Sequence, residues 1–227
     1  ARLFDVLVGD WDRHYDQWLW AGYKIDGKTI YRPVPRDRDQ AFSLYDGILP
    51  IVAGRAITQI EGYSGNYPPM YDLTFSGRYI DRTILPKLDY YAYDSLAKFI
   101  QNRLTDDVID EAVRLMPAEW YSAGLTPLKK LIMERRDKLS TVTSEYYELI
   151  NEVADVYGTN KNEEVRIDCR GDEMRIEIFK RKKNGELESS PFYSRSFYPE
   201  FTDEIRIYLN EGNDNVKISG TTSPNGE

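Results

Sequence analysis

The spacing of the hydrophobic residues changes part-way along the chain, and this change limits the folds that the chain can adopt. Between residues 94 and 158 the hydrophobic residues recur at every third or fourth position, which predicts helices. Between residues 163 and 220 they alternate with polar residues, as in Val165-Arg166-Ile167-Asp168-Cys169, which predicts strands. A helical segment followed by a strand segment predicts an α+β fold.

The first 93 residues are rich in Gly, Pro and Tyr and show little helical periodicity. Residues Arg2–Val8 are typical of the end of a helix, because their apolar side chains share one side and Gly9 follows. A β-hairpin is predicted next, with strands at Trp18–Tyr23 and Thr29–Val34 joined by an Asp26-Gly27 turn. From residue 40 to residue 93, turn signals allow only short helices or irregular structure.

The remaining residues predict two regions with different architectures. One helix is expected over Asp106–Leu115, and Thr126 starts either one long helix to Gly158 or two that meet near Ser140-Thr141. The alternating segment predicts a small antiparallel β module with turns at Gly171-Asp172 and Asn184-Gly185. A polar run separates the two regions, so we predict one domain over residues 1–158 and another over residues 159–227.

Rare residue types exclude several kinds of functional site. The 227 residues include one Cys, Cys169, and one His, His14. An internal disulfide, a zinc finger built on cysteines and a site with several His ligands are therefore excluded. The net charge of −8 and the lack of a basic stripe argue against nucleic-acid binding. No stretch approaches the roughly 18 to 20 apolar residues of a membrane span, so none is expected.

Chemistry is therefore expected from carboxylates or from His14. Asp12 and Gln17 lie just before the predicted hairpin and Asp37 lies just after it. A hairpin returns the chain to its starting point, so these three residues should converge within about 10 Å. Two carboxylates and an amide oxygen suit a hard divalent cation that holds phosphate oxygens. A nearby carboxylate could also accept the proton of an attacking hydroxyl.

The surrounding side chains have simpler expected roles. Trp11, Trp18 and Trp20 are expected to be core residues beneath the loop and the strand. His14 is expected to hold the loop through backbone hydrogen bonds rather than to act as an acid or base. Additional acidic charge around the site is expected from Asp10, Asp16 and Asp39. Pairing with these acids is expected of Arg13, Arg36 and Arg38.

The order of these motifs resembles that of a known superfamily. A helix, the sequence G-D-W-D-R-H-x-D-Q, a hairpin and then P-x-D-x-D are similar to the catalytic core of atypical protein-kinase-like enzymes. The CotH spore-coat kinases, the HipA toxin kinases and the Golgi casein kinase group belong to this superfamily. The CotH pattern has a similar W-D-x-x-x-x-N loop and, after a hairpin, a P-W-D-L-D segment. The resemblance covers about 40 residues and implies that residues 1–158 are a kinase-like C-lobe remnant.

The resemblance implies a role for each matching residue. Asp12 falls at the catalytic base, and Asp37 matches the metal-binding aspartate that ordinary kinases carry in their DFG motif. Gln17 falls where the loop usually has an Asn that binds the second metal, while His14 and Asp39 match supporting residues. The implied cofactor is Mg or Mn with ATP, and the implied partners are the nucleotide and a hydroxyl acceptor.

The sequence departs from the pattern in two places. Gln17 is longer than Asn by one methylene, which moves its amide oxygen by about 1.5 Å. No G-x-G-x-x-G motif occurs, and no ATP-anchoring Lys segment precedes Ala1, so we expect a kinase fragment that is inactive alone.

Other functional interpretations stay open at this point. The main alternative is a non-catalytic, pseudokinase-like structural or docking module of a cell-envelope protein. A glycosidase that uses Asp12 and Asp37 as its acid pair is possible on spacing alone. The segments 134–139 and 202–208 resemble parts of large bacterial cell-envelope proteins, in which a kinase-like region precedes a β-rich one. A location in the cell envelope is expected from this resemblance only, and the composition leaves a cytoplasmic location open.

Overall fold

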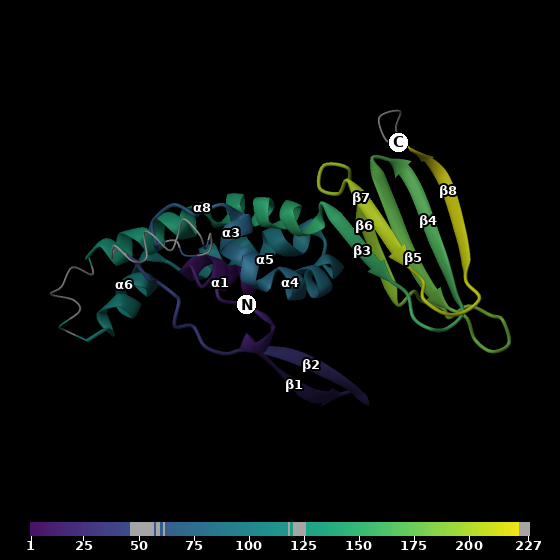
Figure 1. The fold of residues 1–227 in the computed structure, drawn as a ribbon, viewed down its shortest axis with the longest axis horizontal. Coiled ribbons are helices and arrows are strands. Elements are labelled where there is room, and N and C mark those ends of the chain that lie inside the picture. Colours follow the sequence, from purple (N-terminus) through teal and green to yellow (C-terminus); the bar gives the residue numbers. More distant parts are fainter. Residues whose placement is uncertain (46–56, 58–59, 61, 118, 120–125, 223–227) are drawn as a thin grey trace. The chain divides into compact units, whose positions relative to one another are not determined.

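The computed structural model describes residues 1–227 except for 46–56, 58–59, 61, 118, 120–125 and 223–227. The chain forms two compact units. The first contains Ala1–Asp81 and Tyr91–Tyr146, and the second contains Arg82–Tyr90 and Tyr147–Glu227. Helices predominate in one unit and strands in the other, so the predicted α+β class is confirmed (Figure 1).

The elements of the first half of the chain are mostly helices, with one hairpin between them. In chain order they are α1 (Arg2–Val8), η1 (Tyr15–Gln17), β1 (Trp18–Ile25), β2 (Lys28–Pro35), α3 (Met70–Thr74), η2 (Phe75–Gly77), α4 (Arg78–Ile84), η3 (Leu85–Lys87), α5 (Tyr90–Arg103), α6 (Asp106–Arg114) and α8 (Thr126–Asn151). The short helices α3 and α4, with the 3-10 turns η2 and η3, confirm the expectation of short helices for the described part of residues 40–89, whereas residues 90–93 already belong to the longer helix α5.

The hairpin β1–β2 has the predicted turn and is longer than predicted. Ile25 pairs with Lys28, and the register continues to Trp18 opposite Pro35. Asp26 (φ 48°) and Gly27 (φ 74°) both adopt left-handed backbone angles, as a two-residue turn of this twist requires. Figure 1 shows the two strands extending away from the helices of the same unit. Seven large apolar side chains of the hairpin are exposed: Leu19, Trp20, Tyr23, Ile25, Ile30, Tyr31 and Val34.

The core of the first unit forms where α1, α5, α6 and α8 contribute apolar side chains. Leu3, Val6 and Leu7 of α1 are buried because they share one face of that helix. The other helices add buried residues at helical spacing, including Tyr93, Ala97, Ile109, Val113, Leu139, Val142 and Tyr146. This packing holds α1 in place, and α1 leads directly into the candidate site.

The second unit is built around two small sheets. Strand β3 (Val153–Tyr157) pairs in parallel with β7 (Glu204–Tyr208). The other sheet has the order β6-β5-β4-β8, with β4 (Glu163–Gly171), β5 (Glu173–Lys180), β6 (Tyr193–Phe197) and β8 (Asn215–Thr222). Apolar side chains of both sheets form one buried cluster: Ala154, Val156, Val165, Ile176, Ile178 and Phe197. Cys169 is buried on β4, as the alternation predicts.

Three expectations about the fold are wrong at least in part. The helix from Thr126 does not reach Gly158, because α8 ends at Asn151 and Val153–Tyr157 is a strand whose alternate residues are buried. The β module is mixed rather than antiparallel, since β4 also pairs in parallel with β8. Of the tryptophans expected in the core, Trp18 is buried, but Trp20 is 40% exposed.

None of the helices within the described residues combines the length and the apolar character needed to cross a bilayer.

Candidate functional site

The candidate site begins at the C-terminus of α1. Gly9 ends this helix with a left-handed backbone (φ 73°), and the Asp10 N–H donates to the carbonyl of Asp5 (2.9 Å). A Cβ atom at Gly9 would lie 2.8 Å from Cδ2 of Tyr63, closer than real contacts allow. Glycine is therefore required both by the backbone angle and by the neighbouring ring. These constraints set the direction in which the Asp10–Gln17 loop leaves the helix.

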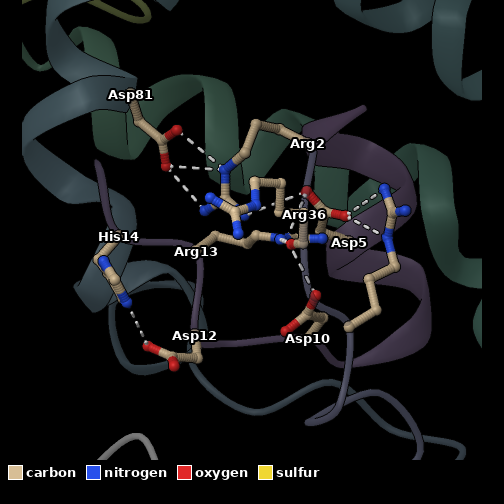
Figure 2. Close-up of polar contacts among 9 residues, drawn as sticks. Arg2, Asp5, Asp10, Asp12, Arg13, His14, Arg36 and Asp81 are labelled. Atoms are coloured by element: carbon tan, nitrogen blue, oxygen red, sulfur yellow. Dashed lines mark hydrogen bonds and ion pairs between the residues drawn. The ribbon is translucent and has the colours of Figure 1, made fainter. Parts of the chain in front are cut away.

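Asp12 and His14 lie next to each other in this loop. Nε2 of His14 is 3.8 Å from Oδ1 of Asp12, and both side chains are partly exposed (Figure 2). The Asp16 N–H donates to Nδ1 of His14 (3.3 Å), so His14 caps the short helix η1. In the neutral ring the proton is then at Nε2, which faces Asp12. The exposed part of the Asp12 carboxylate can accept or orient the proton of a bound hydroxyl.

The hairpin places Gln17 next to the segment that carries Asp37. The Arg36 N–H donates to the carbonyl of Gln17 (2.8 Å), which extends the strand pairing by one step beyond Trp18 and Pro35. Asp37 follows directly and is exposed. Its backbone is left-handed (φ 50°), and between Lys28 and Gln40 it is the one residue with a positive φ. Asp39 is also exposed. Gln17 and Asp37 therefore offer hard oxygen ligands from neighbouring positions of the fold.

A buried ionic cluster lies beneath this surface (Figure 2). Arg13 is fully buried, and its Nε lies 2.9 Å from Oδ2 of Asp10 and 3.3 Å from Oδ2 of Asp5. Its Nη1 donates to the carbonyl of Arg36. Arg38 contacts the other oxygen of Asp5, with Nη2 3.0 Å from Oδ1. The prediction that these arginines pair with the nearby acids is confirmed for Arg13, which contacts Asp10, whereas Arg38 contacts Asp5, an acid outside the expected group.

A second pair completes the cluster. Arg2 of α1 donates three hydrogen bonds to both carboxylate oxygens of Asp81 in α4, at 2.8 to 3.1 Å. Both side chains are almost fully buried, and Nη1 of Arg2 also lies 3.8 Å from Asp5. A role in the site was not predicted for Arg2, Asp5 or Asp81. A signal was present at Arg2 and Asp5, which are charged yet three residues apart on the apolar side of a helix.

Asp10 is an acid of this cluster whose ionisation is strongly perturbed. The pKa of Asp10 is raised to about 6, chiefly because the carboxyl is buried; the neighbouring Asp5 also raises it, while Arg13 opposes both effects. Within the described residues, neither carboxylate oxygen of Asp10 accepts a hydrogen bond. The charged form of Asp10 loses its hydration on burial, and without hydrogen bonds it is stabilised mainly by the ion pair with Arg13.

Arg135 of α8 holds the same end of α1 from another side. Its guanidinium is buried and donates to the carbonyls of Val6 (3.3 Å) and Ser64 (2.7 Å). It also lies over the rings of Tyr63 and Tyr67, at 4.2 and 4.6 Å from their centroids. A cation at the C-terminus of a helix is favourable because the last carbonyls carry partial negative charge. Arg135 thereby fixes the helix end from which the Asp12 loop starts.

In the part of the chain that the structure describes, no three His, Cys, Asp or Glu side chains are grouped so as to share a metal ion. The ligands expected from the sequence, Asp12, Gln17 and Asp37, are a different kind of group, because they combine one amide oxygen with two carboxylates. Comparisons of the chain with family models, curated proteins and solved structures found no match.

Proposed function

We propose that this chain carries the catalytic half of a kinase-like phosphotransferase that uses Mg or Mn with ATP and acts on a hydroxyl acceptor. In this proposal Asp12 orients or accepts the hydroxyl proton. Gln17 and Asp37 hold the metal ion, and His14 and Asp39 support them. The proposal rests on the order of motifs in the sequence and on one structural observation.

That observation is the backbone hydrogen bond from the Arg36 N–H to the carbonyl of Gln17. It supports the proposal because it shows that the hairpin closes directly at the expected metal-ligand positions. A wider hairpin mouth would separate Gln17 from Asp37 by more than one metal ion can bridge, since such ligands lie within about 2.6 Å of the ion. Asp12 lies in the loop that ends at Gln17, with His14 as its neighbour.

The test is a titration of the protein with Mn²⁺ and ATP. Binding is measured by calorimetry and by the electron paramagnetic resonance signal of free Mn²⁺. We expect one Mn–ATP complex per chain, and Asp37→Asn should weaken its binding at least about tenfold, since one ionic ligand is lost. Gln17→Asn should strengthen binding, because it shortens the side chain to the length that the superfamily uses.

Asp26→Asn is the matched control. It removes one carboxylate at the far end of the same hairpin, at a position where the backbone is also left-handed and where Asn is tolerated. It should bind Mn–ATP as the wild type does. If the wild type binds no Mn–ATP, or if Asp37→Asn binds as tightly as Asp26→Asn, the metal assignment is wrong and a non-catalytic module becomes the better interpretation.

A further inference from the structure

Arg13 contacts α1, the Asp10–Gln17 loop, the start of β1 and the residue that precedes Asp37. Its backbone stands between Asp12 and His14, whereas its side chain points inward and is fully buried. The guanidinium reaches Asp5 in α1 and Asp10 in the loop through ion pairs. It also lies 5.7 Å from the ring centroid of Trp18, the first residue of β1.

The contact with Arg36 gives Arg13 a role beyond charge neutralisation. Nη1 of Arg13 donates to the carbonyl oxygen of Arg36, which belongs to the peptide group that joins Arg36 to Asp37. The N–H of Arg36 donates in turn to Gln17. The residue before Asp37 is therefore held on both of its polar backbone groups. Asp adopts a left-handed backbone more readily than most residues, and these two bonds fix the position of the residue from which the φ of 50° at Asp37 follows.

We propose that Arg13 is a positioning residue that fastens the loop bearing Asp12 to the segment bearing Asp37. Its side chain sets the separation of the two carboxylates through the Arg36 carbonyl, while Asp5 and Asp10 fix the guanidinium itself. The geometric part of this inference stands without any assumed activity. The consequence for metal binding rests on the proposed phosphotransferase function.

The shape of the guanidinium matters more than its charge in this role. Its Nε lies within 3.3 Å of both carboxylates while its Nη1 donates to the Arg36 carbonyl, so two nitrogens of one planar group face the acids and the carbonyl in fixed directions. A lysine ammonium at the same position would still neutralise Asp10, but it is a compact charge without the fork. Arg13→Lys should therefore preserve the ion pair and lose the link to Arg36.

Arg38→Lys is the matched control. Arg38 belongs to the same cluster and contacts Asp5, but it contacts neither Asp10 nor the Arg36 carbonyl in the bonds that the structure describes. The two variants make the same chemical change and keep the same net charge. They differ in whether the link between the two segments is lost.

Hydrogen exchange measured by mass spectrometry tests the link directly. In Arg13→Lys, the backbone amides of residues 10–17 and 34–39 should both exchange at least about tenfold faster, since local opening becomes easier in both segments. Amides in the middle of the hairpin should be unchanged, and Arg38→Lys should resemble the wild type in both segments. A role confined to stability would instead accelerate exchange throughout the unit. Uniform acceleration, no acceleration, or acceleration of one segment alone overturns the proposal.

A measurement on the wild type covers the case in which Arg13→Lys does not fold. The guanidinium protons of Arg13 should give nuclear magnetic resonance signals that exchange slowly with water, because the group is buried and bonded to a carbonyl. The exposed Arg82 serves as the reference for fast exchange. Exchange of the Arg13 protons as fast as those of Arg82 contradicts the proposal.

Mn–ATP binding separates this inference from the proposed function. If both stand, Arg13→Lys weakens binding at least about tenfold and Arg38→Lys changes it by less than about twofold. If the wild type binds no Mn–ATP while the exchange pattern is as expected, the link stands and the phosphotransferase proposal falls. If the wild type binds and Arg13→Lys binds equally well, the positioning role is wrong and the function stands.

Discussion

The buried pair of Arg2 and Asp81 provides the strongest prediction about stability. Asp81→Asn keeps the size of the side chain and removes its charge, so that among the described residues the ion pair left to the buried Arg2 guanidinium is the one with Asp5 at 3.8 Å. Removing one partner of a buried ion pair costs about 3 to 5 kcal/mol, because the other charge stays desolvated. Three hydrogen bonds at 2.8 to 3.1 Å and near-complete burial place this pair in that class.

The free energy of unfolding can be measured in urea through tryptophan fluorescence. The three described tryptophans, Trp11, Trp18 and Trp20, all lie in the first unit, as Arg2 and Asp81 do. We therefore expect the unfolding midpoint of the fluorescence transition to fall sharply in Asp81→Asn. In a thermal scan this loss corresponds to roughly 10 to 17 °C for a unit of this size.

Asp94→Asn is the matched control, since Asp94 pairs with Lys98 at 2.7 Å in the same unit, with the Lys98 side chain 62% exposed. An exposed pair of this kind contributes about 0 to 1 kcal/mol. The double variant Arg2→Met with Asp81→Leu should recover most of the loss, because it leaves no buried charge unpaired. A loss in Asp81→Asn no larger than that in Asp94→Asn would refute the reasoning.

Three further predictions concern other parts of the molecule. Because the folded-state pKa of Asp10 lies above the ordinary value of 3.8, this group favours folding most at low pH, and its contribution is lost as the pH rises through about 6; Asp10→Asn should flatten the change of unfolding free energy between about pH 4 and pH 6, and an unchanged slope would contradict it. Ile176→Ala should cost the second unit about 2 to 5 kcal/mol, measured by circular dichroism in urea, since Ile176 is fully buried in the apolar cluster. Gly220→Ala should accelerate amide exchange in β8, because a Cβ at this left-handed residue (φ 89°) would lie 1.9 Å from the Cys169 carbonyl oxygen; wild-type exchange there would show that the strand tolerates it.

The sequence predicts local structure better than long-range pairing, and two elements show why. The hairpin could be predicted because Asp26-Gly27 suits a left-handed turn and its strands lie close together in the chain. For strand β3 the sequence predicts a continuation of the preceding helix, because Leu149, Ile150 and Val153 have helical spacing. Its parallel partner β7 lies about fifty residues further on, and no local pattern indicates that pairing.

The candidate site likewise combines one contact that the sequence predicts with others that it does not. The proximity of Gln17 to Arg36 follows from the hairpin, so it could be predicted. The arrangement around Arg13 could not, because it combines residues of α1, the loop and the end of β2 through side chains rather than strand pairing. Asp81 is 79 residues from Arg2, and its role depends on how α4 packs against α1.

The exposed hairpin also affects how the protein behaves at high concentration. Leu19 pairs with Val34 on one face, and Trp20 pairs with Pro33 on the other, so apolar side chains cover both sides of the two strands. Strands with apolar surfaces and open edges adhere to one another when molecules meet often. Light scattering should therefore rise with protein concentration more steeply than for a chain of the same net charge without this hairpin. Tyr31→Glu, on the face shared by Trp20, should lower that rise and provide a variant better suited to spectroscopy at high concentration.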